Sequence, residues 1–460
     1  MAAPNELAVG LSNHFTQETV MSRQIHRRNF IKTSVAASAF ACAAPVVFQQ
    51  KALGDPSPNE RFVVAGIGLG GMGRGDVNNH RQFGDIAALC DVDEVRLNEA
   101  NNAIGGKADT YKDYRKVLER DDIDVVSIAT VDHWHVKIAV EAMMAGKHVF
   151  CQKPLTFSLE EVQYVREACK KYDKQVFQVG TQQRDAKNLF LRAVRMVQNG
   201  VLGDIQNMVA GIGGSPNRGT FAVSEPPETL DWDFWQGQVE ARPYRRERCH
   251  GTFRYWYEYA GGTMTDWGAH HVDIAQWAIG ADQPGTGPVK IDGTNAKHPV
   301  EFRDGYPTAD DRYNASHDFD VVCQFASGTT LHVTSKADNG ILIEGSKGRI
   351  FVNRERITGK PIEEAWDKDL PEDDYVALFK GKPVEWHKAN FYRCIREGGL
   401  PVSDVFSHVQ AMSTCHLCVI AARFNRVLRW DPEKETIVGD DQAQAFFGRE
   451  RRKGFELETL

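Results

Sequence analysis

Apolar and polar positions between residues 61 and 93 follow the order strand, turn, helix, strand. The run RFVVAGIG (61–68) is rich in Val and Ile, which is typical of a strand buried on both faces of a parallel sheet. The turn GLGGMG (68–73) follows at once, a helix is expected to begin near Met72, and IAALCDVD (86–93) predicts a second strand. The same alternation continues in strands at 123–130, 147–154 and 175–184 and in a helix at 135–146. The sequence therefore predicts an α/β fold with a doubly wound parallel sheet.

After about residue 185 the pattern changes to strands joined by hairpins. The segments 319–335 and 341–353 each read as two strands around a short glycine-containing turn. A second, α+β domain with a mostly antiparallel open sheet is expected. The full division predicted is an extension at 1–43, a linker at 44–59, the first domain at 60–184, the second at 185–430 and a tail at 431–460.

Length and composition narrow the class of protein. At 460 residues the chain is too long for one hydrophobic core, which supports two domains. The formal net charge of -7 argues against a nucleic-acid partner. Nine cysteines show no disulfide framework, and the close pair in CHLC (415–418) lies in an apolar helical pattern at 404–424, where core packing is favoured over a metal or redox site. No run after the amino end reaches the roughly 20 apolar residues of a membrane span, so none is expected in the mature protein.

The amino end resembles a twin-arginine export signal. RRNFIK (27–32) precedes an Ala-rich apolar run at 33–48 that is too short to span a bilayer as a mature helix. We expect export to the periplasm, or otherwise out of the cytoplasm, with the twin-arginine translocase as a transient partner. A flexible basic tail is the alternative. Met21 is a second candidate start, and cleavage near 41–44 and lipidation at Cys42 both stay open.

The glycine turn predicts a bound dinucleotide. Gly68 permits the tight turn, Gly70 lets a pyrophosphate approach the backbone, and Gly73 lets the helix pack on the strand. The carboxylate of Asp91, after the second strand, can accept hydrogen bonds from a ribose 2'-OH and would repel a 2'-phosphate, which favours NAD over NADP. An ordinary tight turn is the alternative. The predicted cofactor contacts are Gly68, Leu69, Gly70, Gly71, Met72 and Asp91, with Thr130 and His135 at the carboxyl end of a later strand.

Two motifs carry candidate chemistry. In CQKP (151–154), Lys153 follows a strand and can hydrogen-bond a substrate hydroxyl as that hydroxyl loses its proton. In GGTMTDWGAHHVD (261–273), Asp266 and His270 are four residues apart, so on one helix the carboxylate can orient the imidazole of a general base. A structural helix cap and a metal site that adds Asp273 are the alternatives, and no metal is expected.

Two aromatic segments, 230–237 and 243–259, are crowded with Trp, Tyr and Arg. Aromatic faces stack on sugar rings and Arg forks bind hydroxyls or carboxylates. A core aromatic cluster or a subunit interface is the alternative. The candidate substrate contacts are Arg184, Arg254, Tyr255 and Trp256.

Together these residues resemble the Gfo/Idh/MocA oxidoreductases, with AGKHVFCQKP standing where that family has AGKHV..EKP and with its GG...D.G.H..D pattern at 261–273. The resemblance implies that Lys153, Asp266 and His270 form the catalytic trio, that the first domain holds NAD, and that the second domain's open sheet forms the substrate pocket and part of an oligomer interface. A homodimer or homotetramer is expected. Gln152 replaces the family's Glu, which removes a charged neighbour of Lys153.

Three functions are then open. The first is reversible hydride transfer between NAD and a secondary hydroxyl of a sugar, glycoside or cyclitol. The second is an NAD-dependent glycoside hydrolase that oxidises the sugar, eliminates the aglycone and reduces again. The third is a binding protein that retains NAD. An exported enzyme has no external NAD supply, so tight cofactor binding is expected in each.

Overall fold

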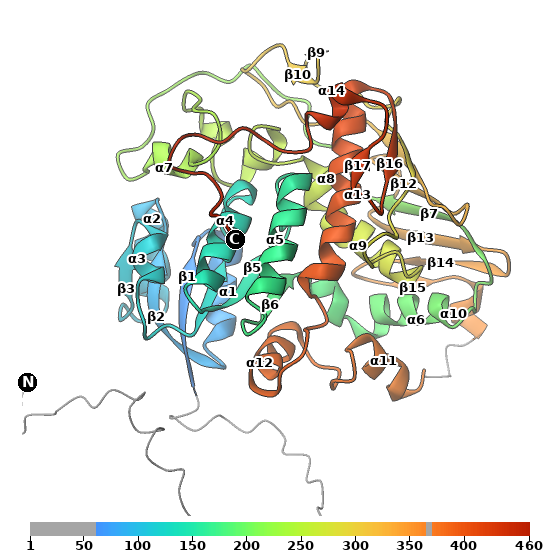
Figure 1. Ribbon diagram of the computed structural model, residues 1–460, viewed down its shortest axis with the longest axis horizontal. Coiled ribbons are helices and arrows are strands. Elements are labelled where there is room, and N and C mark those ends of the chain that lie inside the picture. The colour runs from blue at the N-terminus through green and yellow to red at the C-terminus, as the bar shows by residue number, and fades with distance from the viewer. Residues whose placement is uncertain (1–60, 365–369) are drawn as a thin grey trace, which may run out of the picture. The chain divides into compact units, whose positions relative to one another are not determined.

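The computed structural model describes residues 61–364 and 370–460 (Figure 1). The expected export signal at 27–48, the second start at Met21 and the cysteine at Cys42 lie outside the described residues.

A six-stranded parallel sheet forms the first part of the described chain, in the order β3-β2-β1-β4-β5-β6. Its order reverses between β1 and β4, which leaves a crevice at the carboxyl ends of those two strands. The doubly wound fold is confirmed. The strands are β1 (Phe62–Ile67), β2 (Gly84–Cys90), β3 (Asp109–Tyr111), β4 (Val125–Ile128), β5 (His148–Gln152) and β6 (Phe177–Gly180). The helices are α1 (Gly71–His80), α2 (Glu94–Ala103), α3 (Tyr114–Leu118), α4 (His135–Met144) and α5 (Leu159–Lys171).

A nine-stranded sheet dominates the second part, in the order β15-β14-β13-β7-β12-β11-β8-β16-β17. Only the β7–β12 pair is parallel, so the sheet is mixed and mostly antiparallel, as expected. The two predicted hairpins are β11–β12 and β13–β14. The strands are β7 (Ile205–Gly211), β8 (Lys290–Asp292), β11 (Asp320–Gln324), β12 (Thr330–Thr334), β13 (Gly340–Gly345), β14 (Gly348–Val352), β15 (Ile357–Thr358), β16 (Val427–Asp431) and β17 (Thr436–Ile437), beside a separate pair, β9 (Phe302–Arg303) and β10 (Tyr306–Pro307).

Helix α13 (Val405–Phe424) packs against both parts of the fold. Asp404 caps its start by accepting a 3.0 Å hydrogen bond from the Ser407 N–H, and Asn425 ends it in the left-handed conformation at φ +51°. Figure 1 shows it in orange-red between α5 and α9. By length and apolar composition it is the one described helix that could cross a membrane, but 94% of its most apolar window is buried inside the protein, as in a core helix. The remaining helices are α6 (Arg192–Gln198), α7 (Trp232–Gln236), α8 (Thr263–Asp266), α9 (Gly268–Ala278), α10 (Lys360–Glu364), α11 (Glu372–Leu378), α12 (His387–Glu397) and α14 (Asp441–Gln444).

The carboxyl-terminal segment, expected as a tail from residue 431, carries β17 and α14 and then crosses back to the first domain (Figure 1). Lys137 of α4 donates to the Glu456 carbonyl at 2.6 Å, and the Phe455 ring packs edge-on to that of Trp134. These last residues therefore help to join the two halves of the fold.

Candidate active site

The glycine turn between β1 and α1 leaves room only for glycine at two positions. A Cβ on Gly73 would lie 1.8 Å from the Gly68 carbonyl oxygen. Gly68 itself has φ +81°, and a Cβ there would lie 2.6 Å from the backbone of Ala129. The turn thus brings bare backbone to the crevice between β1 and β4, where a pyrophosphate can approach the first N–H groups of α1.

All the predicted cofactor residues line one cleft at this turn, a cavity of about 230 Å³. Asp91 accepts hydrogen bonds there from the Leu69 N–H at 2.6 Å and from the Asp93 N–H at 2.9 Å, while burial raises its carboxyl pKa. The buried Thr130 hydroxyl, also at the cleft, has no partner within the described chain. The bare glycine turn, this unpaired hydroxyl and the carboxylate of Asp91 fit a dinucleotide.

His135 lines the cleft and also contacts the backbone on two sides. Its Nδ1 lies 2.7 Å from the Pro154 carbonyl and its Nε2 lies 3.2 Å from that of Thr130. Burial lowers its pKa to about 4, so the ring is neutral near pH 7. The ring therefore fixes the turn that follows Lys153.

Lys153 emerges from the end of β5 and meets Asp266, the last residue of α8. The Lys153 ammonium donates to the Asp266 carboxylate at 2.6 Å and to the Asp266 carbonyl at 3.1 Å. On the other side, the Arg254 Nε lies 3.5 Å from the second carboxylate oxygen. Although burial opposes it, the positive charge of Lys153 holds the pKa of Asp266 below its usual range.

The expected Asp266–His270 pair does not form. Asp266 ends α8, whereas His270 lies in α9, which begins after Trp267. The carboxylate turns to the opposite charge of Lys153, and no hydrogen bond links it to the imidazole. Burial, with the nearby charge of Lys153, lowers the pKa of His270 well below its usual value, so the ring is neutral. Its Nδ1 is buried without a partner, which leaves Nε2 as the nitrogen for a ligand.

A second cavity of about 480 Å³ adjoins the cleft and is lined by His270. Both cavities are lined by Met72, Lys153, Arg254 and Asp266. The Lys153–Asp266 pair therefore lies at the junction of the two cavities.

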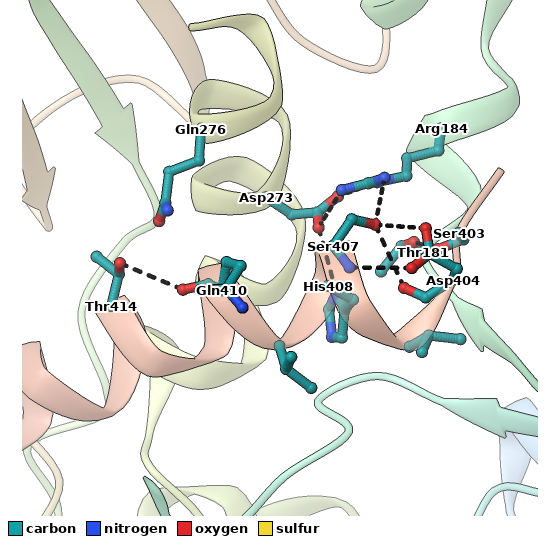
Figure 2. A network of polar contacts seen from close by, with 12 residues as sticks. Thr181, Arg184, Asp273, Gln276, Ser403, Asp404, Ser407, His408, Gln410 and Thr414 are labelled. Carbon is teal, nitrogen blue, oxygen red and sulfur yellow. Dashed lines mark hydrogen bonds and ion pairs between the residues drawn. The ribbon is translucent and has the colours of Figure 1, made fainter. Parts of the chain in front are cut away.

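Arg184, a predicted substrate contact, is buried and lines neither of these two cavities. Its side chain is 1% exposed. Its Nε and Nη2 donate hydrogen bonds to the two carboxylate oxygens of Asp273 in α9, at 2.6 Å and 2.8 Å (Figure 2). It also donates to the Ser407 hydroxyl at 3.0 Å, while His408 approaches Asp273 at 3.2 Å (Figure 2). This arrangement fully engages Asp273 in an interior ion pair, which argues against the metal site considered for it.

The aromatic segments divide between core and cleft. Trp256, also a predicted substrate contact, is fully buried under the guanidinium of Arg248 and lines neither of the two cavities. The Tyr255 ring packs against Tyr313, and Tyr255 lines neither cavity. Arg254 alone among these neighbours reaches both cavities.

The same region covers the dinucleotide cleft, a role that sequence reasoning missed. Leu230 pairs with Asp93 in a β-bridge, and His250 Nε2 lies 3.3 Å from the Asp93 carboxylate. The cover over the cleft comprises Phe234, Trp235, His250, Gly251, Phe253 and Arg254. The abundance of Trp and Arg singled out this segment. Because the segment has no regular periodicity, the sequence did not indicate which of its side chains face the cleft.

Arg354, in the loop after β14, lines the second cavity with its guanidinium 4.7 Å from the Trp267 ring centre, and no sequence signal pointed to it.

Gln152 donates to Asp76 at 2.7 Å, and Lys388 donates to the other Asp76 oxygen at 2.5 Å. The amide thus turns to Asp76 instead of Lys153.

Family models match nearly the whole described chain. Residues 61–181 match "Oxidoreductase family, NAD-binding Rossmann fold" and residues 195–457 match "Oxidoreductase family, C-terminal alpha/beta domain". The chain belongs to the Gfo/Idh/MocA family. It is an NAD-binding oxidoreductase of that family, and its first domain is the NAD-binding Rossmann domain.

Several Gfo/Idh/MocA relatives carry names that describe carbohydrate chemistry. A myo-inositol 2-dehydrogenase of Thermotoga maritima is 27% identical over 306 residues, which cover 64% of this chain and 75% of that protein. A glycosyl hydrolase family 109 protein of Shewanella baltica is 30% identical over 205 residues, but the match spans 39% of this chain and only 44% of the relative.

Solved structures share the fold at low identity. Levoglucosan dehydrogenase in complex with NADH and levoglucosan has a TM-score of 0.57 at 19% identity, covering 80% of this chain and 99% of that one. The WlbA dehydrogenase of Chromobacterium violaceum, with NADH and UDP-GlcNAcA, has a TM-score of 0.56 at 19% identity, covering 81% and 96%.

Proposed function

We propose that the protein transfers a hydride between NAD and a secondary hydroxyl of a sugar, glycoside or cyclitol. The observation that carries this proposal is the position of Lys153 and Asp266, which line both the dinucleotide cleft and the adjoining cavity. The inositol dehydrogenase relative supports the class of substrate. Asp91 in the cleft supports NAD over NADP.

The residues divide the proton chemistry between them. Bound NAD would supply the hydride acceptor. The neutral His270 ring takes the hydroxyl proton as general base through Nε2, which makes no hydrogen bond within the described residues. Lys153, held by Asp266 at 2.6 Å, donates a hydrogen bond to the same oxygen and stabilises the charge that develops on it. Arg254 beside Asp266 adds positive charge to this junction.

An NAD-dependent glycosidase is the second candidate. The glycosyl hydrolase family 109 relative supports it, and so does the cover over the cleft, because a cofactor regenerated in each cycle need never leave. Export with NAD already seated agrees with either candidate. If the cover retains NAD, dialysis of the purified protein leaves the cofactor bound, whereas rapid loss contradicts retention.

One assay separates the candidates. Protein with its cofactor as purified is incubated with inositol, neutral sugars and chromogenic glycosides, while NADH absorbance and chromophore release are recorded together. Net NADH supports the dehydrogenase, and chromophore release without net NADH supports the glycosidase. Retained NAD with neither signal contradicts both and favours a binding protein. Lys153→Met should remove whichever signal appears.

A further inference from the structure

A third cavity, of about 750 Å³, shares no lining residue with the dinucleotide cleft or the cavity beside it. We call it the arginine cavity. It lies between α13, the start of α5 and the carboxyl-terminal segment, and its lining includes Phe157, Tyr257, Arg423 and Arg449. Nothing in the proposed chemistry uses it.

Arg423 and Arg449 line this cavity without a carboxylate partner in the described part of the chain. Arg423 is 7% exposed, and its Nε donates to the Gly305 carbonyl at 2.8 Å while the guanidinium lies 4.5 Å from the centre of the Phe446 ring. Arg449 donates to the Tyr257 carbonyl at 2.5 Å and lies 3.7 Å from the centre of the Phe157 ring. The remaining N–H groups of both forks are free for another acceptor.

The acidic side chains around the cavity are mostly engaged elsewhere. Glu240 pairs with Arg242, and Asp310 pairs with Arg245. Glu258 accepts from the Asn314 amide at 2.7 Å and offsets part of the positive charge. A buried guanidinium without an ion partner is costly, because water is lost and no carboxylate replaces it.

The pKa values agree with this imbalance. Burial lowers the pKa of Arg423 to about 10, despite the opposing negative charge of Glu258. Burial and then the charge of Arg423 lower the pKa of Arg449 to about 9, although the negative charges of Glu161 and Glu258 oppose the shift. Two cations that line one cavity, with the charge of Arg423 lowering the pKa of Arg449, would both gain from an anion bound to them.

We propose that the arginine cavity binds a small anionic molecule through a carboxylate or phosphate group held by Arg423 and Arg449. Guanidinium forks hold either group with paired, charge-assisted hydrogen bonds. The rings of Tyr306 and Phe446, which also line the cavity, offer apolar faces to the rest of the ligand. This site is separate from the catalytic junction, so it stands whichever sugar chemistry the enzyme performs.

The test is calorimetric titration of the full chain at constant ionic strength, with saturating NAD so that the glycine turn is occupied. The probes are inorganic phosphate, glucose 6-phosphate and glucuronate, with glucose as the neutral control. Saturable binding of at least one anion is expected at the arginine cavity, whereas any glucose that binds at the catalytic junction should be unaffected by substitution of Arg449. Binding of phosphates alone, or of glucuronate alone, identifies which oxyanion the site takes.

Variants assign the binding to this cavity. Arg449→Met should weaken the anion at least tenfold, and Arg449→Lys should restore part of the affinity because it keeps the charge but not the fork. Arg423→Met should act like Arg449→Met. The matched control, Arg349→Met, removes a 72% exposed arginine of β14 and should change nothing. Circular dichroism and NAD content check that each variant is folded.

Two results would overturn the proposal. One is the absence of saturable binding by all three anions, and the other is equal affinity in the wild type and folded Arg449→Met. If no anion binds, a change of oligomeric state in Arg449→Met would show that the cavity belongs to an interface between proteins.

Discussion

One motif supplies two ion pairs with opposite surroundings. Asp266 and Asp273, seven residues apart in the GG...D.G.H..D pattern, each meet a cation at 2.6 Å. The side chains of Lys153 and Asp266 are 14% and 16% exposed and line two cavities, whereas those of Arg184 and Asp273 are both 1% exposed.

The difference lies in what else surrounds each pair. Arg184 and Asp273 are satisfied by Ser407, His408 and a backbone carbonyl, so no position is left for a ligand. Within the described residues Lys153 donates hydrogen bonds only to Asp266, and one of its N–H groups can turn to a substrate. The interior pair therefore fixes α9 in place, while the cavity pair is available for chemistry.

The largest expected effect is on turnover at the cavity pair. Lys153→Met and His270→Ala should each lower kcat by about 10²- to 10⁴-fold, because each removes a proton-handling group. NAD content should stay close to the wild type, and the thermal midpoint should fall less than it does when the interior pair is broken. Steady-state kinetics checks this on the active substrate, with Lys170→Met as an exposed control. Full activity in both variants would remove the distinction between the pairs.

At the interior pair the effect should fall on stability. Asp273→Asn leaves the Arg184 guanidinium buried and unpaired, so the free energy of unfolding should fall by about 3–5 kcal/mol. Asp266→Asn should cost less stability, because Lys153 faces cavities that water can enter, and more turnover. Urea denaturation and kcat of the folded fraction measure both. Equal stability losses would mean that the two pairs play the same role.

A carboxylate at position 152 should also act through stability. In Gln152→Glu the new group replaces the amide donor at 2.7 Å from Asp76, so two carboxylates share Lys388. We expect a loss of about 1–3 kcal/mol in the free energy of unfolding, from the lost donor and the like charge. The pH profile of kcat/KM should not move. A shifted profile would show that position 152 tunes Lys153 instead.

As the pH is lowered, the free energy of unfolding should decrease before the Lys153–Asp266 or the Arg184–Asp273 ion pair is lost. The pKa values of Asp266 and Asp273 are held low by their cations, so the stability of both pairs persists above about pH 4 and is lost only as pH falls through the folded values. Burial, in contrast, lowers the pKa values of His133, His387 and His416 to about 3. Below about pH 6.5 these histidines bind protons in the unfolded chain but stay neutral in the folded protein. The free energy of unfolding therefore decreases as the pH is lowered.

His416→Gln isolates one of these contributions. It should reduce the slope of unfolding free energy against pH, between about pH 6 and 4, by up to about 1.4 kcal/mol per pH unit. Urea titrations at several pH values measure the slope. An unchanged slope would mean that His416 is already protonated in the folded protein.

Much of the fold and part of the site followed from local pattern. The glycine turn, the strands around it and the two hairpins were predictable because neighbouring residues alone produce apolar periodicity and turn chemistry. The residues predicted to contact the cofactor came from the same local pattern, and all of them line one cleft. Arg354, the cover over the cleft and the partner of Gln152 were not predictable, because each depends on segments brought together from far along the chain.

The sequence alone determined the doubly wound sheet, the glycine cradle and the presence of Lys153, Asp266 and His270. Only the tertiary structure decided which charge each residue meets. A spacing of four predicted Asp266 and His270 on one helix, but the helix is interrupted at Trp267, and the ammonium of Lys153, at the end of β5, pairs with Asp266. Charge pairs form between groups that folding brings within a few ångströms, and that proximity is not written in local spacing.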